Sequence, residues 1–328
     1  MLRIAVIGLG HPHIFSMIEE VLAQKESFEI VAICDSDSPE NVKKAKDLVP
    51  DAKVYNDLDE LFLDNGFDAV LSSAIFSKKS DLAVRSLKAH KHIMFDKPLS
   101  TTMEGLNEIE KELSLHPDLK IALWLTERYS PTYYTAKKLI DQGAIGEIVH
   151  MYFVRPHRLA PESRPAWLFD RQMYGGILND IGVHDFDLAR WFTGSECAKI
   201  DAAHVSTKRF TEYSIEDNGS VMMTMENGAT CMIFENWLTP EKFPIHGDTR
   251  ATIYGTRGQI EVKAYPESVT LFSDTKEPQE IALIPPPYTS AEDFLKVISD
   301  PQHTALVSTK DACFSTRLAL LAQQKAMN

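Results

Sequence analysis

Residues 4–13 read Ile-Ala-Val-Ile-Gly-Leu-Gly-His-Pro-His, and the organisation of the first part of the chain follows from this stretch. Four apolar residues in a row are typical of a strand that is buried on both faces. Gly8 and Gly10 come directly after them and permit a tight turn with close backbone approach. Pro12 suits the first turn of a helix, because its missing N–H would be unpaired there anyway. The stretch therefore predicts a strand, a glycine turn and a helix.

Strands and helices continue to alternate through the first third of the chain. Apolar runs typical of strands recur at residues 28–34, 53–55, 67–72, 92–95 and 119–125. Helical patterns lie between most of them, at residues 42–48, 58–62, 82–87 and 103–113. This alternation indicates an α/β fold, with a doubly wound parallel sheet that has helices on both faces. We assign residues 1–123 to this domain.

The pattern changes in the rest of the chain, residues 124–328, which we assign to a second domain. Longer alternating segments occur at residues 147–154, 199–205, 220–225, 229–236, 251–254, 259–262 and 268–272. Asn227-Gly228 between two of them predicts a hairpin turn in which both central residues have positive φ. Helices are expected near residues 133–142, from Asp180 onward, and at 291–298 and 309–325. The second domain is therefore predicted to be α+β, with a large, open, mostly antiparallel sheet.

The glycine turn also has the features of a dinucleotide site. Gly8 and Gly10 occupy the first two positions of G-x-G-x-x-G, while His13 replaces the third glycine. Such a turn brings backbone close to a pyrophosphate at a helix N-terminus. Asp35 ends the second strand, where a carboxylate can accept both ribose hydroxyls and repel a 2′-phosphate, which favours NAD over NADP. Asp35 read alone is also a common turn or helix-capping residue, and Asp37 is the other candidate for the ribose.

A lysine, a carboxylate and a histidine form a candidate catalytic set. Lys97 follows the apolar run 92–95, at the carboxyl end of a predicted parallel strand, which is the edge where ligands of open α/β sheets bind. Asp180 and His184 are spaced i, i+4 and would share one face of a helix. Asp187 lies one turn further on, where it could orient the imidazole.

This set fits the oxidation of an alcohol. A histidine can take the hydroxyl proton while the C–H bond gives hydride to a nicotinamide. A nearby lysine can hold the hydroxyl and stabilise negative charge on its oxygen. The alternative for Asp180 and His184 is a capping aspartate with an interior histidine. The preceding Gly175-Gly176, which permits close backbone approach, favours the site.

With these residues the chain resembles the glucose–fructose oxidoreductase, inositol dehydrogenase and rhizopine-catabolism (Gfo/Idh/MocA) family over essentially its whole length. The family signature E-K-P reads Asp96-Lys97-Pro98 here, and the block G-G-x-x-x-D-x-G-x-H-x-x-D is intact from Gly175 to Asp187. Residues 128–131 and 143–146 also match family patterns. The resemblance implies a Rossmann domain, a nicotinamide cofactor, and a sugar, polyol or sugar-acid-like substrate. By position it makes Lys97, Asp180 and His184 catalytic, with His184 as acid/base.

Two departures from the family pattern concern the cofactor side. Asp96 replaces the usual glutamate, and the family stretch T-P-N-x-x-H reads Ala-Ile-Phe-Ser-Lys-Lys at residues 74–79. The expected cofactor contacts are Gly8, Gly10, His11, Pro12, His13, Asp35, Ser73, Ala74, Ile75, Phe76, Asp96 and Lys97.

A cationic cluster precedes the Asp180 helix and is the candidate substrate side. Its members are Arg155, His157, Arg158, Arg164 and Trp167, to which Arg128 of the family-matched segment is added. It would favour an anionic or heavily hydroxylated ligand; the alternative is a solvated loop paired with acidic neighbours. Lys242, His246 and Asp248 form a second polar loop that could reach the same pocket.

The composition limits which kinds of partner the protein is expected to have. A net charge of −13 argues against nucleic acid and anionic membrane surfaces. Four dispersed cysteines without a C-x-x-C pair fit free thiols in a reducing compartment, and no metal site is expected. The absence of a signal peptide and of long apolar runs makes a cytoplasmic location the expectation. An open sheet exposes apolar surface that is rare in monomers, so we expect a homodimer or homotetramer formed through it.

Two other functions remain open at this stage. One is a redox-assisted glycosidase or epimerase-like enzyme that retains NAD and oxidises its substrate transiently. The other is a non-catalytic dinucleotide-binding regulator on the same fold. All three catalytic residues are present, which favours the dehydrogenase, because a regulator has no chemical need for them.

Overall fold

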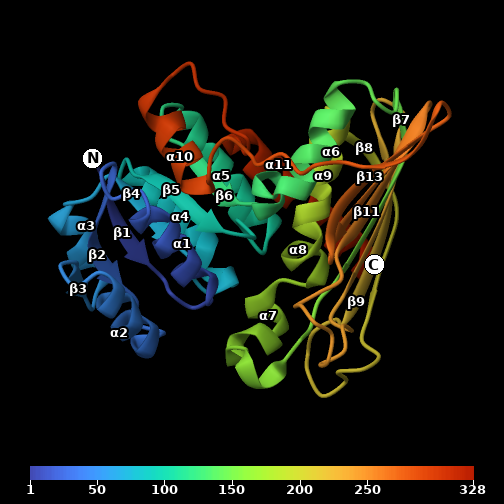
Figure 1. Ribbon diagram of the computed structural model, residues 1–328. Helices are drawn as coiled ribbons and strands as arrows, with labels where there is room; N and C mark the ends of the chain where they lie inside the picture. Colours follow the sequence, from blue (N-terminus) through green and yellow to red (C-terminus); the bar gives the residue numbers. More distant parts are fainter. The chain divides into compact units, whose positions relative to one another are not determined.

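The computed structural model describes all 328 residues, which divide into two compact units (Figure 1). The first unit comprises Met1–Leu125, Gln172–Gly175 and Tyr288–Thr316. The second comprises Thr126–Arg171, Gly176–Pro287 and Arg317–Asn328. The chain therefore passes between the units more than once.

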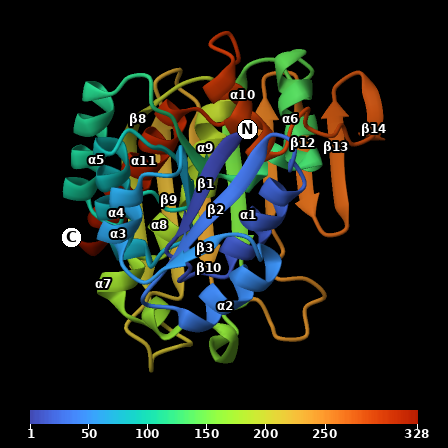
Figure 2. The same ribbon diagram turned by 90° about the vertical axis from the view of Figure 1, so that its left-hand side faces the viewer.

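The first unit is built on a six-stranded parallel sheet in the order β3-β2-β1-β4-β5-β6, of which Figure 2 labels β1, β2 and β3. Its strands are β1 (Leu2–Ile7), β2 (Phe28–Cys34), β3 (Lys53–Tyr55), β4 (Ala69–Ser72), β5 (His92–Asp96) and β6 (Ile121–Trp124). Its connecting helices are α1 (His13–Leu22), α2 (Pro39–Leu48), α3 (Leu58–Asp64), α4 (Lys79–Lys88) and α5 (Met103–Leu115), with the 3-10 turn η1 (Phe76–Lys78) before α4. The predicted doubly wound parallel sheet is confirmed, and its strand order reverses between β1 and β4.

One core of the first unit lies between the sheet and helices α1, α2 and α10 (Ser290–Ser299). Helix α1 buries Ile14, Met17, Ile18 and Val21, the i, i+3, i+4, i+7 spacing of an amphipathic helix. Helix α10 adds Phe294 to the same core. The division at residue 123 assigns this late segment to the second domain, but its apolar face packs on the first. That return of the chain leaves no signal in local sequence patterns.

The second unit is built on an eight-stranded sheet in the order β14-β13-β12-β11-β7-β10-β9-β8. Its strands are β7 (Ile148–Pro156), β8 (Cys197–Ser206), β9 (Asn218–Met225), β10 (Thr230–Asn236), β11 (Arg250–Gly255), β12 (Gly258–Ala264), β13 (Glu267–Ser273) and β14 (Lys276–Glu280). Only β7 and β10 pair in parallel, so the predicted mostly antiparallel sheet is confirmed. Strand β14 is exposed along its length and has no apolar alternation by which it could be predicted.

Helices cover only one face of this sheet, as Figure 1 shows. They are α6 (Pro131–Asp141), α8 (Ile177–Asp180) and α9 (Gly182–Thr193). The shorter elements are η2 (Thr126–Tyr129), η3 (Pro161–Ser163), η4 (Ala166–Phe169) and α7 (Arg171–Tyr174). The last helix, α11 (Thr309–Met327), belongs to the first unit as far as Thr316 and to the second from Arg317. No helix combines the length and the apolar character that a membrane crossing requires.

The hairpin between β9 and β10 forms as predicted, but with a different turn. Only Gly228 has positive φ, at 87°, whereas Asn227 does not. The Gly228 N–H donates to Met225 O, and the Met225 N–H donates to Ala229 O. These bonds describe a type I turn followed by a left-handed glycine, the usual form when a hairpin loop exceeds two residues. The prediction that both central residues have positive φ was therefore wrong.

Candidate active site

The glycine turn between β1 and α1 packs its backbone directly on the residues that follow β4. A Cβ on Gly8, whose φ is +70°, would lie 2.6 Å from the Ala74 Cβ. A Cβ on Gly10 would lie 2.9 Å from the Ile75 nitrogen. Both positions therefore need glycine, and the Gly8 backbone lines the cavity at the carboxyl edge of the sheet.

Asp35 at the end of β2 holds this turn. Its Oδ2 accepts a hydrogen bond from the Leu9 N–H at 2.5 Å, and its Oδ1 accepts one from the Asp37 N–H at 2.7 Å. The carboxylate lines a cavity of about 370 Å³ at the carboxyl ends of β1 and β2. Lys78 and Arg85 line the same cavity, and each is paired with an acid, Lys78 with Asp37 at 2.6 Å and Arg85 with Asp59 at 2.5 Å.

His13 and Asp96 connect the start of α1 to the end of β5. The His13 Nδ1 lies 3.1 Å from Asp96 Oδ1, and the His11 Nδ1 lies 3.6 Å from Asp96 Oδ2. These three ligand atoms lie within 4.8 Å of one another, a spacing that a metal could use. The ammonium group of Lys79, 3.8 Å from Asp96 Oδ2, already provides a positive charge for this carboxylate.

Burial and charge set the protonation of this cluster. Burial lowers the pKa of His11 well below its ordinary value, and the nearby His13 lowers it further. Burial alone would raise the pKa of Asp96, but Lys79 and His13 hold it well below the ordinary value. Asp96 is therefore a carboxylate and His11 a neutral imidazole at neutral pH.

Lys97 directly follows β5, as the sequence predicts. Its side chain is buried, with 7% of the residue exposed, and its ammonium nitrogen lies 5.8 Å from the centre of the Phe76 ring. It lies at the same edge of the parallel sheet as Gly8 and Asp35, because β5 runs in the direction of β1 and β2. A buried lysine at this edge is a candidate for chemistry rather than for solubility.

Asp180 and His184 lie in the second unit, at the end of α8 and in the first turn of α9. The two short helices meet at Ile181, which keeps a right-handed helical conformation, so the predicted one-turn spacing is retained. Both side chains are buried. Gly176 precedes α8 with φ +104°, and a Cβ there would lie 2.4 Å from the Gln323 side chain. The Gln323 Oε1 accepts the Leu178 N–H at 3.0 Å, which fixes the start of α8.

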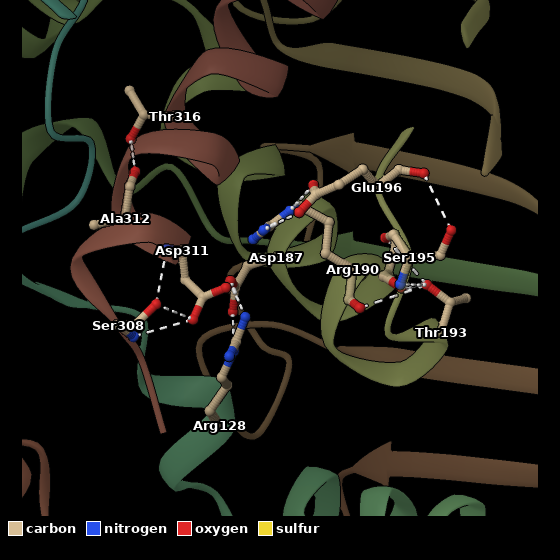
Figure 3. A network of polar contacts seen from close by, with 11 residues as sticks. Arg128, Asp187, Arg190, Thr193, Ser195, Glu196, Ser308, Asp311, Ala312 and Thr316 are labelled. Atoms are coloured by element: carbon tan, nitrogen blue, oxygen red, sulfur yellow. Dashed lines mark hydrogen bonds and ion pairs between the residues drawn. The ribbon is translucent and has the colours of Figure 1, made fainter. Parts of the chain in front are cut away.

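Arginine–carboxylate pairs fix helix α9 (Figure 3). The Arg128 Nε and Nη2 donate to Asp187 at 2.7 and 2.6 Å, with both residues buried. The Arg190 Nε and Nη2 donate to Glu196 at 2.7 and 2.8 Å. Bidentate pairs of this kind restrict orientation as well as adding energy. Arg128 thus engages both oxygens of Asp187, the residue that the sequence suggests as a partner of His184.

Arg155 is the centre of a second buried network. Its Nη2 and Nε donate to Asp185 Oδ1 at 2.6 and 3.1 Å, and its Nη1 donates to Glu127. Glu235 on β10 is 1% exposed and faces Asp185. Burial, followed by the negative charge of Asp185, raises the pKa of Glu235 well above its ordinary value. Glu235 therefore stays protonated to a higher pH than an ordinary glutamate.

The other candidate substrate residues lie in loops that follow β7. The Arg158 Nη2 donates to the backbone carbonyls of Phe243 and Ile245. The Arg164 Nη2 lies 3.3 Å from His246 Nε2, and the His157 and His246 rings are 4.8 Å apart. Trp167 is in η4 and half-buried. The predicted second polar loop thus joins the first through His246, whereas the contacts of Arg155 and Arg128 are with buried acids.

The first unit has features that suit a dinucleotide. Glycine backbone lies at the ends of the strands, a carboxylate lines a cavity beside it, and α1 begins directly after the glycine turn. Gly8, Gly10 and the start of α1 would hold the pyrophosphate, and Asp35 would hold the adenosine ribose. Asp35 also fits the alternative that it is a turn residue, because its carboxylate accepts hydrogen bonds from two backbone amides.

Sequence reasoning missed three buried side chains that organise these sites. Lys79, Gln323 and Glu235 all act on residues far away in the chain. Lys79 contacts a segment 17 residues later, and Gln323 reaches one 145 residues earlier. No local pattern marks such residues, apart from the unusual presence of Lys or Glu within otherwise apolar or helix-starting stretches.

Comparison with known proteins matches both units. Residues 2–117 match the oxidoreductase family with an NAD-binding Rossmann fold, and residues 133–261 match the GFO/IDH/MocA C-terminal domain. Myo-inositol 2-dehydrogenase of Thermotoga maritima is 26% identical over 284 residues, covering 83% of this chain and 78% of that protein. Scyllo-inositol 2-dehydrogenase (NAD(+)) of Bacillus subtilis is 26% identical, covering 79% and 72%. A crystal structure of an oxidoreductase from Erwinia carotovora superimposes with a TM-score of 0.90 at 29% identity, covering 99% of both chains.

The two domain matches, in the expected order, agree with the parallel sheet followed by the open sheet. The chain is thus an oxidoreductase of the NAD-binding Gfo/Idh/MocA family, a family of nicotinamide-dependent dehydrogenases that act on CH–OH groups.

Proposed function

We propose that the protein transfers hydride between NAD and the hydroxyl-bearing carbon of a sugar, polyol or sugar acid. Lys97, Asp180 and His184 act together on that hydroxyl group. The observation that carries the proposal is Lys97, a buried lysine at the carboxyl edge of a dinucleotide-binding sheet. The names of two relatives, both inositol 2-dehydrogenases, support a polyhydroxylated substrate.

Each residue has a distinct role in this proposal. His184 takes the hydroxyl proton as general base. Lys97 donates a hydrogen bond to the same oxygen and stabilises the negative charge that develops on it. Asp180, one turn before His184, accepts a hydrogen bond from a substrate hydroxyl and so orients the substrate. The bound cofactor supplies the hydride acceptor.

NAD is the proposed cofactor, with NADP disfavoured. Asp35 and Asp37 place negative charge at the cavity beside β2, where a 2′-phosphate would be repelled. The two cations of this cavity, Lys78 and Arg85, are already paired with Asp37 and Asp59. Neither pair therefore leaves a cation free to bind a 2′-phosphate.

We further propose that the protein assembles as a homodimer or homotetramer through the open face of the eight-stranded sheet. Large apolar side chains on this face are exposed, among them Tyr152, Met222, Phe234 and Tyr254. They belong to neighbouring strands β7, β9, β10 and β11. A second copy of the chain would remove this apolar surface from water.

The activity test is a panel of myo-inositol, scyllo-inositol, aldoses and sugar acids, each with NAD and with NADP, followed by absorbance of the reduced cofactor. Lys97→Ala and His184→Ala should lower kcat/KM by about 100-fold or more, because each removes a group that acts in the transition state. Lys25→Ala and His204→Ala, at exposed positions, serve as matched controls.

Two outcomes would contradict the proposal. Unchanged turnover in Lys97→Ala or His184→Ala would remove the proposed catalytic set. Cofactor that copurifies, never exchanges and shows no net reduction with any substrate would instead indicate transient oxidation within a retained-cofactor enzyme.

A further inference from the structure

Lys79 is the first residue of α4, and its side chain is completely buried. Its ammonium nitrogen donates to the backbone carbonyl oxygens of Asp96, at 2.8 Å, and of Lys97, at 3.0 Å. These two carbonyls stand on either side of the Lys97 Cα. Lys79 therefore holds both peptide groups from which the Lys97 side chain projects.

The same ammonium is also the counter-charge of a buried carboxylate. It lies 3.8 Å from Asp96 Oδ2, and neither side chain is exposed to solvent. A buried charge without a partner is costly, so each member of this pair depends on the other. Ser73 and His13 complete the bonding of the carboxylate, with Ser73 Oγ donating at 2.7 Å and His13 Nδ1 at 3.1 Å.

One aromatic ring lies beside both lysines. The Phe76 ring centre is 4.5 Å from the Lys79 nitrogen and 5.8 Å from the Lys97 nitrogen. An aromatic ring attracts a cation over its face, so it guides both side chains. Backbone bonds, an ion pair and one ring together restrict where the Lys97 ammonium can be.

We propose that Lys79 is a positioning residue that fixes the backbone and thereby the ammonium group of Lys97 for the reaction. This inference rests on the proposed catalytic role of Lys97. The Lys79 ammonium group donates to both carbonyls and keeps its charge 3.8 Å from the carboxylate, whereas an imidazolium has only two donors, fixed to one ring.

The two departures from the family pattern now belong to one arrangement. Lys79 stands where T-P-N-x-x-H has histidine, and Asp96 stands where E-K-P has glutamate. A longer cation here faces a shorter carboxylate at 3.8 Å. Lysine is longer than histidine and aspartate is shorter than glutamate, so the two exchanges compensate in length. Replacing only one of the two residues by the family's residue should therefore disturb the ion pair. Replacing both should restore contact between the cation and the carboxylate.

The experiment measures steady-state kinetics of Lys79→Met, Lys79→His, Asp96→Glu and the double variant Lys79→His/Asp96→Glu, using the substrate that the panel identifies. Each single variant should lower kcat by about 10- to 100-fold, and the Lys79 variants should leave KM and NAD affinity nearly unchanged, since misplacement of a catalytic group by about 1 Å is enough for such a loss. The double variant should recover most of kcat. With C-deuterated substrate, the primary isotope effect on kcat should increase in the single variants.

Controls separate this inference from the proposed function. Lys111→Met, at an exposed position of α5 beside the exposed Glu108, should behave as wild type. If Lys97→Ala abolishes turnover while folded Lys79→Met and both single reversions keep wild-type kcat, the positioning role is overturned and the proposed function stands. If Lys97→Ala retains turnover, the proposed function itself fails. If Lys79→Met does not fold, the double variant decides. A kcat of Lys79→His/Asp96→Glu no higher than that of Lys79→His or Asp96→Glu alone overturns the inference.

Discussion

The buried charged clusters of the two units are opposite in composition. In the first unit a single carboxylate, Asp96, is surrounded by Lys79 and His13, with Lys97 next to it in the chain. In the second unit a single guanidinium, Arg155, is surrounded by Asp185, Glu127 and Glu235.

Burial, together with the excess of one sign, decides which group changes its protonation state. Cations keep Asp96 ionised, with its pKa well below the ordinary value, while His11 beside it is kept neutral. Burial and the negative charge of Asp185 raise the pKa of Glu235, so Glu235 stays protonated to a higher pH than an ordinary glutamate. A folded protein therefore balances a buried cluster by losing or retaining one proton, in whichever direction the excess requires.

Removing Arg155 should have the largest effect on stability. Arg155→Ala leaves the buried Asp185 and the partly buried Glu127 without their cation, and the free energy of unfolding should fall by about 3–5 kcal/mol. Urea unfolding measures this change. Arg250→Ala, which breaks an exposed pair with Asp248, is the control and should change stability by at most about 1 kcal/mol. If Arg155→Ala lost as little unfolding free energy as this control does, the acids would be shown to need no cation.

Replacing Glu235 by glutamine tests the raised pKa of Glu235 through the pH dependence of stability. The folded-state pKa of Glu235 is raised, so its favourable contribution is complete below the unfolded pKa, about 4.5, and is lost as pH rises toward the folded pKa. As pH rises, the free energy of unfolding of wild type should therefore fall relative to that of Glu235→Gln. The total fall should be about 1.4 kcal/mol for each unit by which the folded-state pKa is raised.

Urea unfolding of both proteins between about pH 4.5 and 8 measures this difference, with Glu280→Gln on the exposed strand β14 as control. A stability difference that does not vary with pH would show that Glu235 is ionised in the folded state.

The smallest effect on the stability of one chain is expected on the other face of the same strand. Phe234 precedes Glu235 on β10 but is 38% exposed, because alternate residues of a strand point to opposite faces. Phe234→Asp should lower the unfolding free energy of a single chain by about 1 kcal/mol, because it removes the contact with the Tyr152 ring and places a poor strand former in β10. It should nevertheless lower the mass in solution to that of a monomer, measured by light scattering at micromolar concentration.

Gln279→Asp, at the polar edge strand β14, should leave the mass unchanged. A wild-type protein that is already monomeric under these conditions would contradict assembly through the open face.

The fold and the local motifs of the site could be predicted from the sequence because they depend on neighbouring residues. Four apolar residues before Gly8 define a buried strand, and the i, i+4 spacing of Asp180 and His184 survives at the junction of two short helices. The return of α10 to the first unit could not be predicted, since its partner surface lies more than 250 residues earlier.

The arginines show the same limit for function. Arg128 and Arg155 were expected on the substrate side because they are cations in an acidic protein. Their bonds to Asp187 and Asp185 span 59 and 30 residues, and no local pattern shows that these acids are buried beside them. Their role toward substrate stays a prediction, as do those of His157, Arg158, Arg164 and Trp167.

A double-mutant cycle tests most directly whether Lys97 and His184, which come from different units, serve one reaction. The kcat/KM values of Lys97→Ala, His184→Ala and the double variant would be compared with wild type on the substrate that the panel identifies. We predict that the double variant loses little more activity than either single variant, because residues that act as a unit in catalysis are strongly non-additive. Losses that multiply across the cycle, or a single variant with wild-type kcat/KM, would contradict the proposal.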